Sequence, residues 1–271
     1  MATVTWTGGA NDGNWATGGN WSGAAAPSST DDVFLLTTSQ DITLGLNQSA
    51  ITLASLTISR GFGGSIGSAS AALQINVSGT LTYAGSGSYA KINGTIATAN
   101  IDRTGSGTFY LSGGTWTTTT VSAGRVLVDG AAVLTTFRDI TGEVNEIPWN
   151  ATAITLLENE AGVVVCKRTV TTLTNAAKAT TTVEQDGTNA PASTTVNNRG
   201  LLRWNSSGTV TTGNNYPAAT WDNSQTEYSY AVTTLNDWAG GSFQDTYAGG
   251  AVTVGTRNRI GKAMGPALPM V

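Results

Sequence analysis

Five short apolar strands decide the fold: Leu56-Thr57-Ile58, Leu73-Gln74-Ile75-Asn76-Val77, Ala90-Lys91-Ile92, Phe109-Tyr110-Leu111 and Val126-Leu127-Val128. Their anchor residues Ile58, Ile75, Ile92, Phe109 and Val126 recur every 17 residues. Gly, Ser, Thr and Asn fill the intervals between strands and supply turns. Short strands at a fixed period predict a solenoid, in which each coil buries its apolar side by stacking on its neighbours. We therefore predict an all-β, right-handed parallel β-helix with about 17–19 residues per coil.

Composition supports this prediction. The chain has 271 residues, of which 11% are charged and 34 are glycine. Strong helix formers are scarce and β-branched residues are plentiful, so helix should be minor. The formal net charge of −4 argues against a general nucleic-acid binder. We find no window of 18 consecutive apolar residues, so we expect no membrane-spanning segment and no membrane partner.

The opening segment of the chain has a character of its own. Trp6, Trp15 and Trp21 follow one another closely, among Gly and Asn. The open apolar end of a solenoid must be covered, and a compact Trp- and Gly-rich structure suits that role. We therefore expect an N-terminal cap over residues 1–32, with an exposed aromatic sugar site as the alternative.

The remaining chain divides into three parts by pattern. Residues 33–203 continue the strand period and should form the β-helix. Residues 204–254 form a less regular region in which Trp204, Trp221 and Trp238 are each 17 residues apart. These rings either fill the core or a subunit interface, or form an exposed column that offers platforms to a sugar chain. Residues 255–271 should form an extended arm.

The C-terminal arm contains basic and apolar residues and no acid. Its candidate contact residues are Arg257, Arg259, Lys262, Leu268 and Val271. Apolar residues spread between Gly and Pro cannot form a core of their own, so the arm either orders on a partner surface or frays.

Signals for chemistry are sparse. The chain has no His, which removes the common triads and most zinc sites. Acidic residues near the central coils are scattered, and Glu158 with Glu160 reads as a solvated pair. The single Cys166 lies in an apolar run and should be a small buried side chain. We therefore expect no catalytic residues, no metal site and no cofactor.

Two resemblances extend this interpretation. The segment from Trp6 to Val33 follows the pattern W-x-x-G, then N-W, then P-x-x-x-D-x-V, and resembles the opening of many β-helical surface proteins, among them bacterial passenger domains and phage particle proteins. As a whole, the sparsely charged chain is similar to the β-helical decoration, or cement, proteins of tailed bacteriophages.

The second resemblance implies a function. It implies a homotrimer of parallel solenoids that binds the major capsid protein on the outside of the virion and stabilises the head without catalysis. The opening residues carry no secretory signal, so we expect assembly in the host cytoplasm. By the same resemblance, Trp6, Trp15, Trp21 and the C-terminal arm are the candidate docking residues.

Three alternatives belong to other classes of protein. A phage tail fibre or spike would bind a host glycan through exposed tryptophans. A polysaccharide-cleaving β-helix enzyme would need clustered carboxylates with a basic residue on one lateral face. A cellular adhesin would need an export signal.

Overall fold

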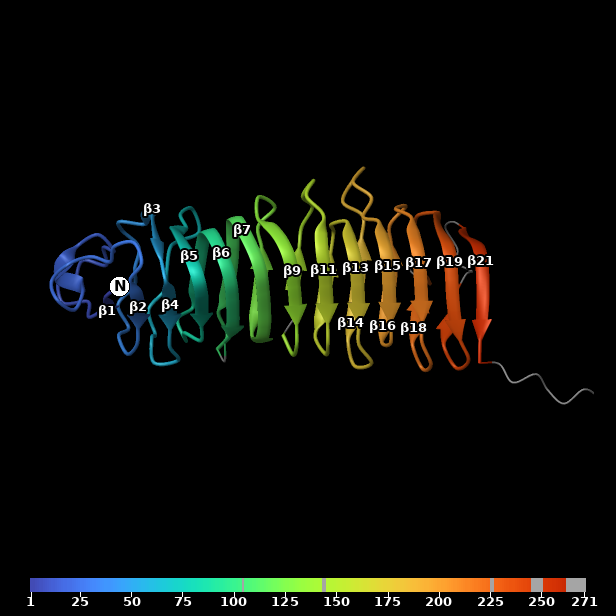
Figure 1. The fold of residues 1–271 in the computed structure, drawn as a ribbon, viewed down its shortest axis with the longest axis horizontal. Helices are drawn as coiled ribbons and strands as arrows, with labels where there is room; N and C mark the ends of the chain where they lie inside the picture. The colour runs from blue at the N-terminus through green and yellow to red at the C-terminus, as the bar shows by residue number, and fades with distance from the viewer. Residues whose placement is uncertain (104, 143–144, 225–226, 245–250, 262–271) are drawn as a thin grey trace, which may run out of the picture.

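The computed structural model describes residues 1–103, 105–142, 145–224, 227–244 and 251–261. It is a parallel β-solenoid, as expected from the sequence, with strands stacked along one long axis (Figure 1). All pairings between the described strands β1 to β21 are parallel. The right-handed winding stays a prediction.

The strands form two long ladders. The first contains β1 (Thr3–Thr5), β2 (Asp32–Leu35), β4 (Ser55–Ile58), β9 (Val133–Asp139), β11 (Ile154–Asn159), β13 (Val170–Asn175), β15 (Ser193–Asn198), β17 (Val210–Asn215), β19 (Tyr230–Trp238) and β21 (Val252–Ile260). The second contains β3 (Asn47–Leu53), β8 (Arg125–Val128), β10 (Asn145–Ile147), β12 (Val163–Cys166), β14 (Thr180–Glu184), β16 (Leu201–Asn205), β18 (Thr220–Asp222) and β20 (Ser242–Phe243). Three long strands contribute to both ladders: β5 (Leu73–Tyr83), β6 (Tyr89–Asp102) and β7 (Thr108–Ala123).

The coil length varies more than the sequence period indicates. The coil from Thr3 to its partner Asp32 is much longer than the coil from Ile154 to its partner Val170. The pairing of Phe109 with Val126 keeps the expected interval. The other anchors are buried but lie in different columns, because turns of unequal length separate the strands. Ile92, for example, pairs with Leu111 rather than with Phe109.

Apolar side chains form continuous columns inside the solenoid. One of them passes through β6, β7, β8, β10, β12, β14 and β16, and its members are at most 5% exposed. It consists of Ile92, Leu111, Val128, Ile147, Cys166, Val183 and Trp204. Burial of each such side chain contributes about 1.5–3 kcal/mol, so the stacked coils, rather than any single coil, hold the fold.

A second internal column is polar. Asp139, Asn159, Asn175, Asn198 and Asn215 occupy successive coils in register, and each is at most 1% exposed. Their amides bond to one another and to turns: Asn175 Nδ2 donates to Asn198 Oδ1 at 2.9 Å, and Asn198 Nδ2 donates to Asn215 Oδ1 at 3.0 Å. These bonds offset the cost of burying polar groups. We call this column the asparagine ladder.

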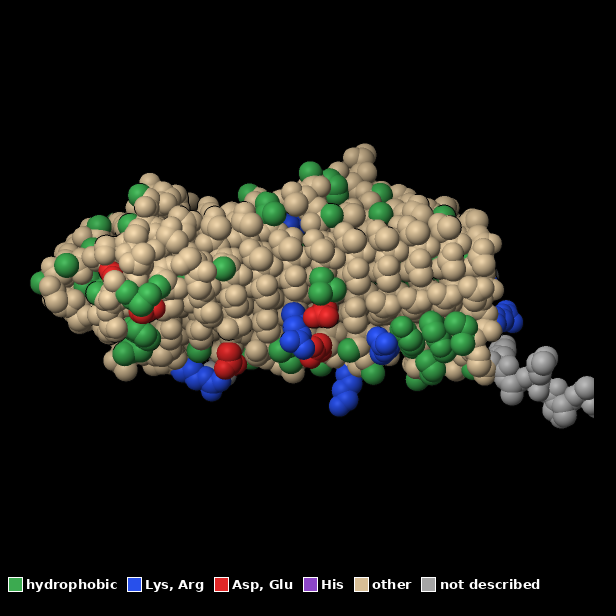
Figure 2. Space-filling view, viewed as in Figure 1, with side chains coloured by type: hydrophobic (Ala, Val, Ile, Leu, Met, Phe, Trp, Pro, Cys, Tyr) green, Lys and Arg blue, Asp and Glu red, His purple; other side chains and the backbone are tan. Residues whose placement is uncertain are grey.

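The outer face of the first ladder carries short uncharged side chains. Thr172, Thr195, Thr212, Thr234 and Thr256 lie in register on β13, β15, β17, β19 and β21. A parallel row of hydrogen-bonded amides follows, formed by Asn197, Asn214, Asn236 and Asn258. In Figure 2 this face is nearly free of charge apart from a group of acidic and basic side chains near its lower edge. We call it the threonine face.

The N-terminal end is closed by a compact Trp-rich structure that includes the short 3-10 helix η1 (Gly18–Asn20). Trp21 packs edge-on against both Trp6 and Trp15, with ring centroids 4.9 and 4.7 Å apart. The Trp21 indole N–H donates to the Trp15 carbonyl at 2.7 Å. This structure lies at one end of the solenoid, beside β1 (Figure 1).

The solenoid extends through the region expected to be less regular. Its strand β16 spans the expected boundary between residues 203 and 204, and parallel pairing continues through β18, β19 and β20. The first residues of the expected C-terminal arm belong to β21, which pairs with β19 up to Ile260. Arg257 and Arg259 are therefore strand residues rather than parts of an extended arm.

Candidate functional site

In the last described coil, a charged residue takes the place of an apolar core residue. Arg257 of β21 occupies the register position that Leu235 fills one coil earlier. Its guanidinium pairs with Asp237 Oδ2 at 2.7 Å and lies 5.5 Å from the centroid of the Phe243 ring. A water-facing charge at this position prevents a bare apolar surface at the end of the described solenoid.

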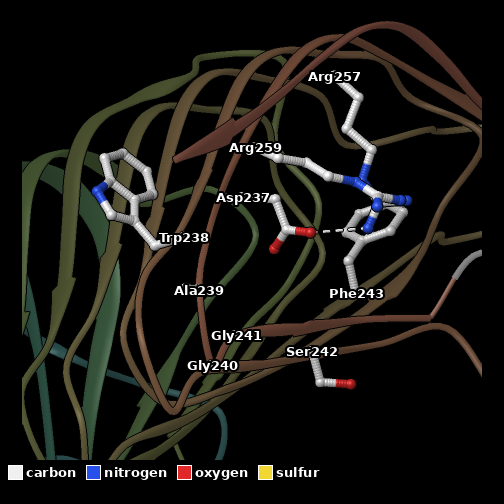
Figure 3. Close-up of a pocket in the computed structure, with 9 residues that line it drawn as sticks. All are labelled: Asp237, Trp238, Ala239, Gly240, Gly241, Ser242, Phe243, Arg257 and Arg259. Atoms are coloured by element: carbon white, nitrogen blue, oxygen red, sulfur yellow. Dashed lines mark hydrogen bonds and ion pairs between the residues drawn. The ribbon is translucent and has the colours of Figure 1, made fainter. Parts of the chain in front are cut away.

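A shallow pocket surrounds this ion pair (Figure 3). It is lined by Asp237, Trp238, Ala239, Gly240, Gly241, Ser242, Phe243, Arg257 and Arg259. The Trp238 ring points away from the Asp237–Arg257 pair in Figure 3. Among the residues that the structure describes, Asp237 is the only carboxylate in this lining, and it is held by Arg257.

Trp238 belongs instead to a stack on the outside of the solenoid. Its ring lies on that of Tyr216, with centroids 4.5 Å apart and planes inclined by 18°. The Arg199 guanidinium covers the other face of Tyr216, 3.9 Å from the ring centroid. On the far side of Trp238, Ile260 is its register partner on β21. We call this row of Arg199, Tyr216, Trp238 and Ile260 the outer stack.

The outer stack sits where successive turns leave the asparagine ladder. Arg199 follows Asn198, Tyr216 follows Asn215 and Trp238 follows Asp237. The buried ladder fixes the start of each turn, and tight turns follow: the Ala219 N–H donates to the Tyr216 carbonyl at 3.1 Å, and the Gly241 N–H donates to the Trp238 carbonyl at 3.0 Å. Figure 2 shows apolar side chains gathered along this edge of the C-terminal coils, with basic side chains nearby.

Trp204, Trp221 and Trp238 do not form an exposed column. Trp204 and Trp221 are fully buried in the second ladder, whereas Trp238 is half-buried in the first. Their equal spacing does not match the local coil, because Leu202, rather than Trp204, pairs with Trp221. The first two rings therefore fill the core and offer no surface to a sugar.

The N-terminal tryptophans are likewise internal. Trp6, Trp15 and Trp21 are 2%, 0% and 3% exposed. Their rings pack inside the cap rather than on its surface, so docking or subunit contact through them stays a prediction. The other docking candidates Lys262, Leu268 and Val271 lie outside the described residues.

Other titratable groups form ion pairs or are buried. Glu158 and Glu160 both contact Arg138, and Asp102 pairs with Arg60 at 2.7 Å. Burial raises the pKa of the Cys166 thiol to about 11, so it is protonated at neutral pH. Within the described ranges, no three His, Cys, Asp or Glu residues are grouped as metal ligands would be. No helix in the described part of the chain is long and apolar enough to cross a membrane.

No known protein family, curated protein or solved structure matches this chain.

Sequence reasoning missed Arg199 and Tyr216. A signal for Tyr216 exists in the turns: Asn175 to Thr180, Asn215 to Thr220 and Asp237 to Ser242 have equal length and begin and end on similar residues. Aligning the coils on these turns would have placed Tyr216 beside Trp238.

Proposed function

We propose that this protein is a structural protein of a phage particle, a decoration protein that binds the outer surface of the capsid and stabilises it without catalysis. In this proposal its partners are the major capsid protein and two further copies of itself, and it is located on the virion surface.

The observation that supports the proposal most is the continuity of the ladders. Parallel backbone pairing, the apolar columns and the asparagine ladder run from coil to coil along the solenoid. Such an arrangement gives a stiff rod whose parts do not need to move. Stiffness suits a protein that holds its neighbours in place, and many copies of a modest contact act together on a lattice.

The threonine face suits side-by-side packing of solenoids. Its rows of Thr and Asn are flat, regular and uncharged over the last five coils. Bringing such faces together desolvates hydroxyl and amide groups that can pair with one another, and it buries no unpaired charge. This is the surface through which we expect the trimer to form.

The glycan-binding alternative needs exposed ring faces. In the outer stack, Arg199 covers one face of Tyr216 and Trp238 covers the other. Both faces of Tyr216 are therefore covered, whereas a sugar stacks on an open ring face. The enzyme alternative needs clustered carboxylates with a basic residue on one lateral face. Glu158, Glu160 and Arg138 form such a group, but both carboxylates are ion-paired with Arg138, and neither is left free to act as an acid or a base.

The test is the copy number of this chain in particles. Quantitative peptide mass spectrometry on particles purified from lysed host cells would give the ratio of this chain to the major capsid subunit. We expect a ratio within a few-fold of one. A trace ratio would place the chain on the tail or a single vertex, and absence from the particles would overturn the proposal.

A further inference from the structure

We propose that the outer stack of Arg199, Tyr216, Trp238 and Ile260 is the docking ridge of the solenoid, and that it binds a carboxylate-bearing, partly apolar surface of the capsid subunit. The inference rests on the proposed function for the identity of this partner. The chemistry of the partner surface comes from the ridge itself.

The ridge is already assembled in the free protein. The rings of Tyr216 and Trp238 hold each other at 4.5 Å, and Arg199 is held on Tyr216 at 3.9 Å. Side chains fixed before binding lose little rotational freedom on binding. Trp, Tyr and Arg are also the residues that contribute most often to the centres of protein interfaces.

The charge of the ridge selects an acidic partner. Arg60, Arg138 and Arg203 each contact a carboxylate of this chain. Arg199 is exposed, and among the described residues no carboxylate lies within ion-pair distance of it. Stacking on Tyr216 occupies only the flat face of the Arg199 guanidinium and leaves its N–H edge free. That edge can donate two parallel hydrogen bonds to one carboxylate.

A further cation accompanies Arg199. Lys178 lies in the turn that follows Asn175, as Tyr216 lies in the turn that follows Asn215, and it is exposed. It contacts no carboxylate among the described residues, although the chain as a whole carries a net charge of −4. Arg259, by contrast, faces the Asp237–Arg257 pocket rather than the ridge (Figure 3). Unpaired cations beside the stacked rings form a surface that complements acidic and apolar groups together.

The chemistry distinguishes this partner from others. A sugar chain would need an open ring face, and both faces of Tyr216 are covered. A nucleic acid would need a longer basic track than this net acidic chain presents. A second copy of the chain that presented its own ridge would bring the same unpaired cations to the contact.

The experiment measures co-sedimentation of the purified full chain with capsid shells that were assembled without it. The test variant is Arg199→Glu, which reverses one exposed charge and leaves the core untouched. Its matched control is Arg125→Glu, which makes the same charge change at another exposed arginine, at the start of β8. Trp238→Ala tests the apolar part, with its circular dichroism and thermal midpoint recorded to show that it folds.

We expect Arg199→Glu and Trp238→Ala to raise the Kd for shells by about 30-fold or more, as for residues at the centre of an interface. Arg125→Glu should stay within about 2-fold of the wild type. Added salt should weaken wild-type binding more than it weakens the residual binding of Arg199→Glu.

Three outcomes would overturn the inference, and they are distinguishable. Wild-type binding with Arg199→Glu unaffected would overturn the ridge and leave the proposed function intact. A change in oligomeric state with Arg199→Glu, in sedimentation velocity, would show that a second copy occupies the ridge. If the wild type fails to bind shells, the proposed function itself is wrong, and the capsid subunit is not the partner of the ridge.

Discussion

The indole ring of Trp221 occupies the space that a side chain at Gly213 would fill. A Cβ atom at Gly213 would lie 2.9 Å from Cζ3 of Trp221, closer than side chains approach one another. The register neighbours of Gly213 along the first ladder are Val196 and Leu235, both fully buried. At this coil the first ladder therefore has a glycine in place of an apolar side chain, and the Trp221 ring of the second ladder fills the space.

This exchange predicts coupling between the two positions. Gly213→Leu should cost about 1–3 kcal/mol by overpacking, and Trp221→Ala should cost about 3–5 kcal/mol by leaving a cavity. The double variant should be more stable than the sum of the two costs predicts, because each change relieves the defect of the other. Urea unfolding of the four proteins measures the coupling. Strict additivity would show that the two residues do not share this space.

The asparagine ladder predicts a large effect from one buried amide. Asn198→Ala removes bonds to Asn175, Asn215 and the Thr220 carbonyl and leaves their groups unsatisfied. We expect a loss of about 2–4 kcal/mol in the free energy of unfolding.

The adjacent residue supplies the control for the ladder. Asn197→Ala removes an amide from the outer row, where Asn214 can bond to water instead, and should cost less than about 1 kcal/mol. Chemical denaturation compares the two variants. Equal effects would mean that the ladder contributes no more than surface amides do.

The N-terminal cap should weaken in acid through Asp31. This carboxylate accepts hydrogen bonds from the Ser28 and Ala2 backbone N–H groups at 2.9 and 2.8 Å, and these bonds lower its pKa below the usual value. A lowered folded-state pKa stabilises the protein above the unfolded value of about 3.9, and this stabilisation is lost as the pH falls through the folded value.

The comparison of wild type with Asp31→Asn isolates this effect. We expect the wild type to be more stable by about 1–3 kcal/mol at pH 6, with the difference shrinking progressively below about pH 4. Thermal midpoints measured from pH 6 to pH 2 give the difference, because the other carboxylates contribute equally to both proteins. A difference that stays constant with pH would contradict this role of Asp31.

Cys166 should be unreactive in the folded protein. Its side chain is fully buried and its thiol lies 3.4 Å from the Arg168 carbonyl oxygen, while burial raises its pKa to about 11. A thiol reagent such as DTNB at pH 8 should label it only as the solenoid unfolds, so the labelling rate should rise with denaturant. Rapid labelling of the native protein would contradict the burial of this column.

The sequence allowed the solenoid to be predicted because its apolar residues recur at short intervals that no helical pattern explains. It did not allow the register to be predicted, because turns of different length separate the strands. Ile58 pairs with Tyr83, although the next apolar anchor in the sequence is Ile75. A period read from residue spacing cannot detect such insertions.

The same limit explains why the neighbours of Trp238 in the candidate site were not predicted. The regular spacing of the tryptophans grouped Trp238 with Trp204, although Trp238 packs on Tyr216 of the preceding coil. Composition suggested a capping role for the N-terminal segment, but it did not show that the large rings of Trp6, Trp15 and Trp21 form the core of that segment.

The direction of the hydrogen bonds makes the molecule mechanically anisotropic. Bonds between coils point along the solenoid axis, while the covalent chain runs around it. Tension along the axis acts on one layer of hydrogen bonds at a time and peels coils from an end, whereas tension across the axis is resisted by covalent backbone in every coil. A solenoid that binds neighbouring subunits across its width therefore resists their separation far better than one pulled from its ends.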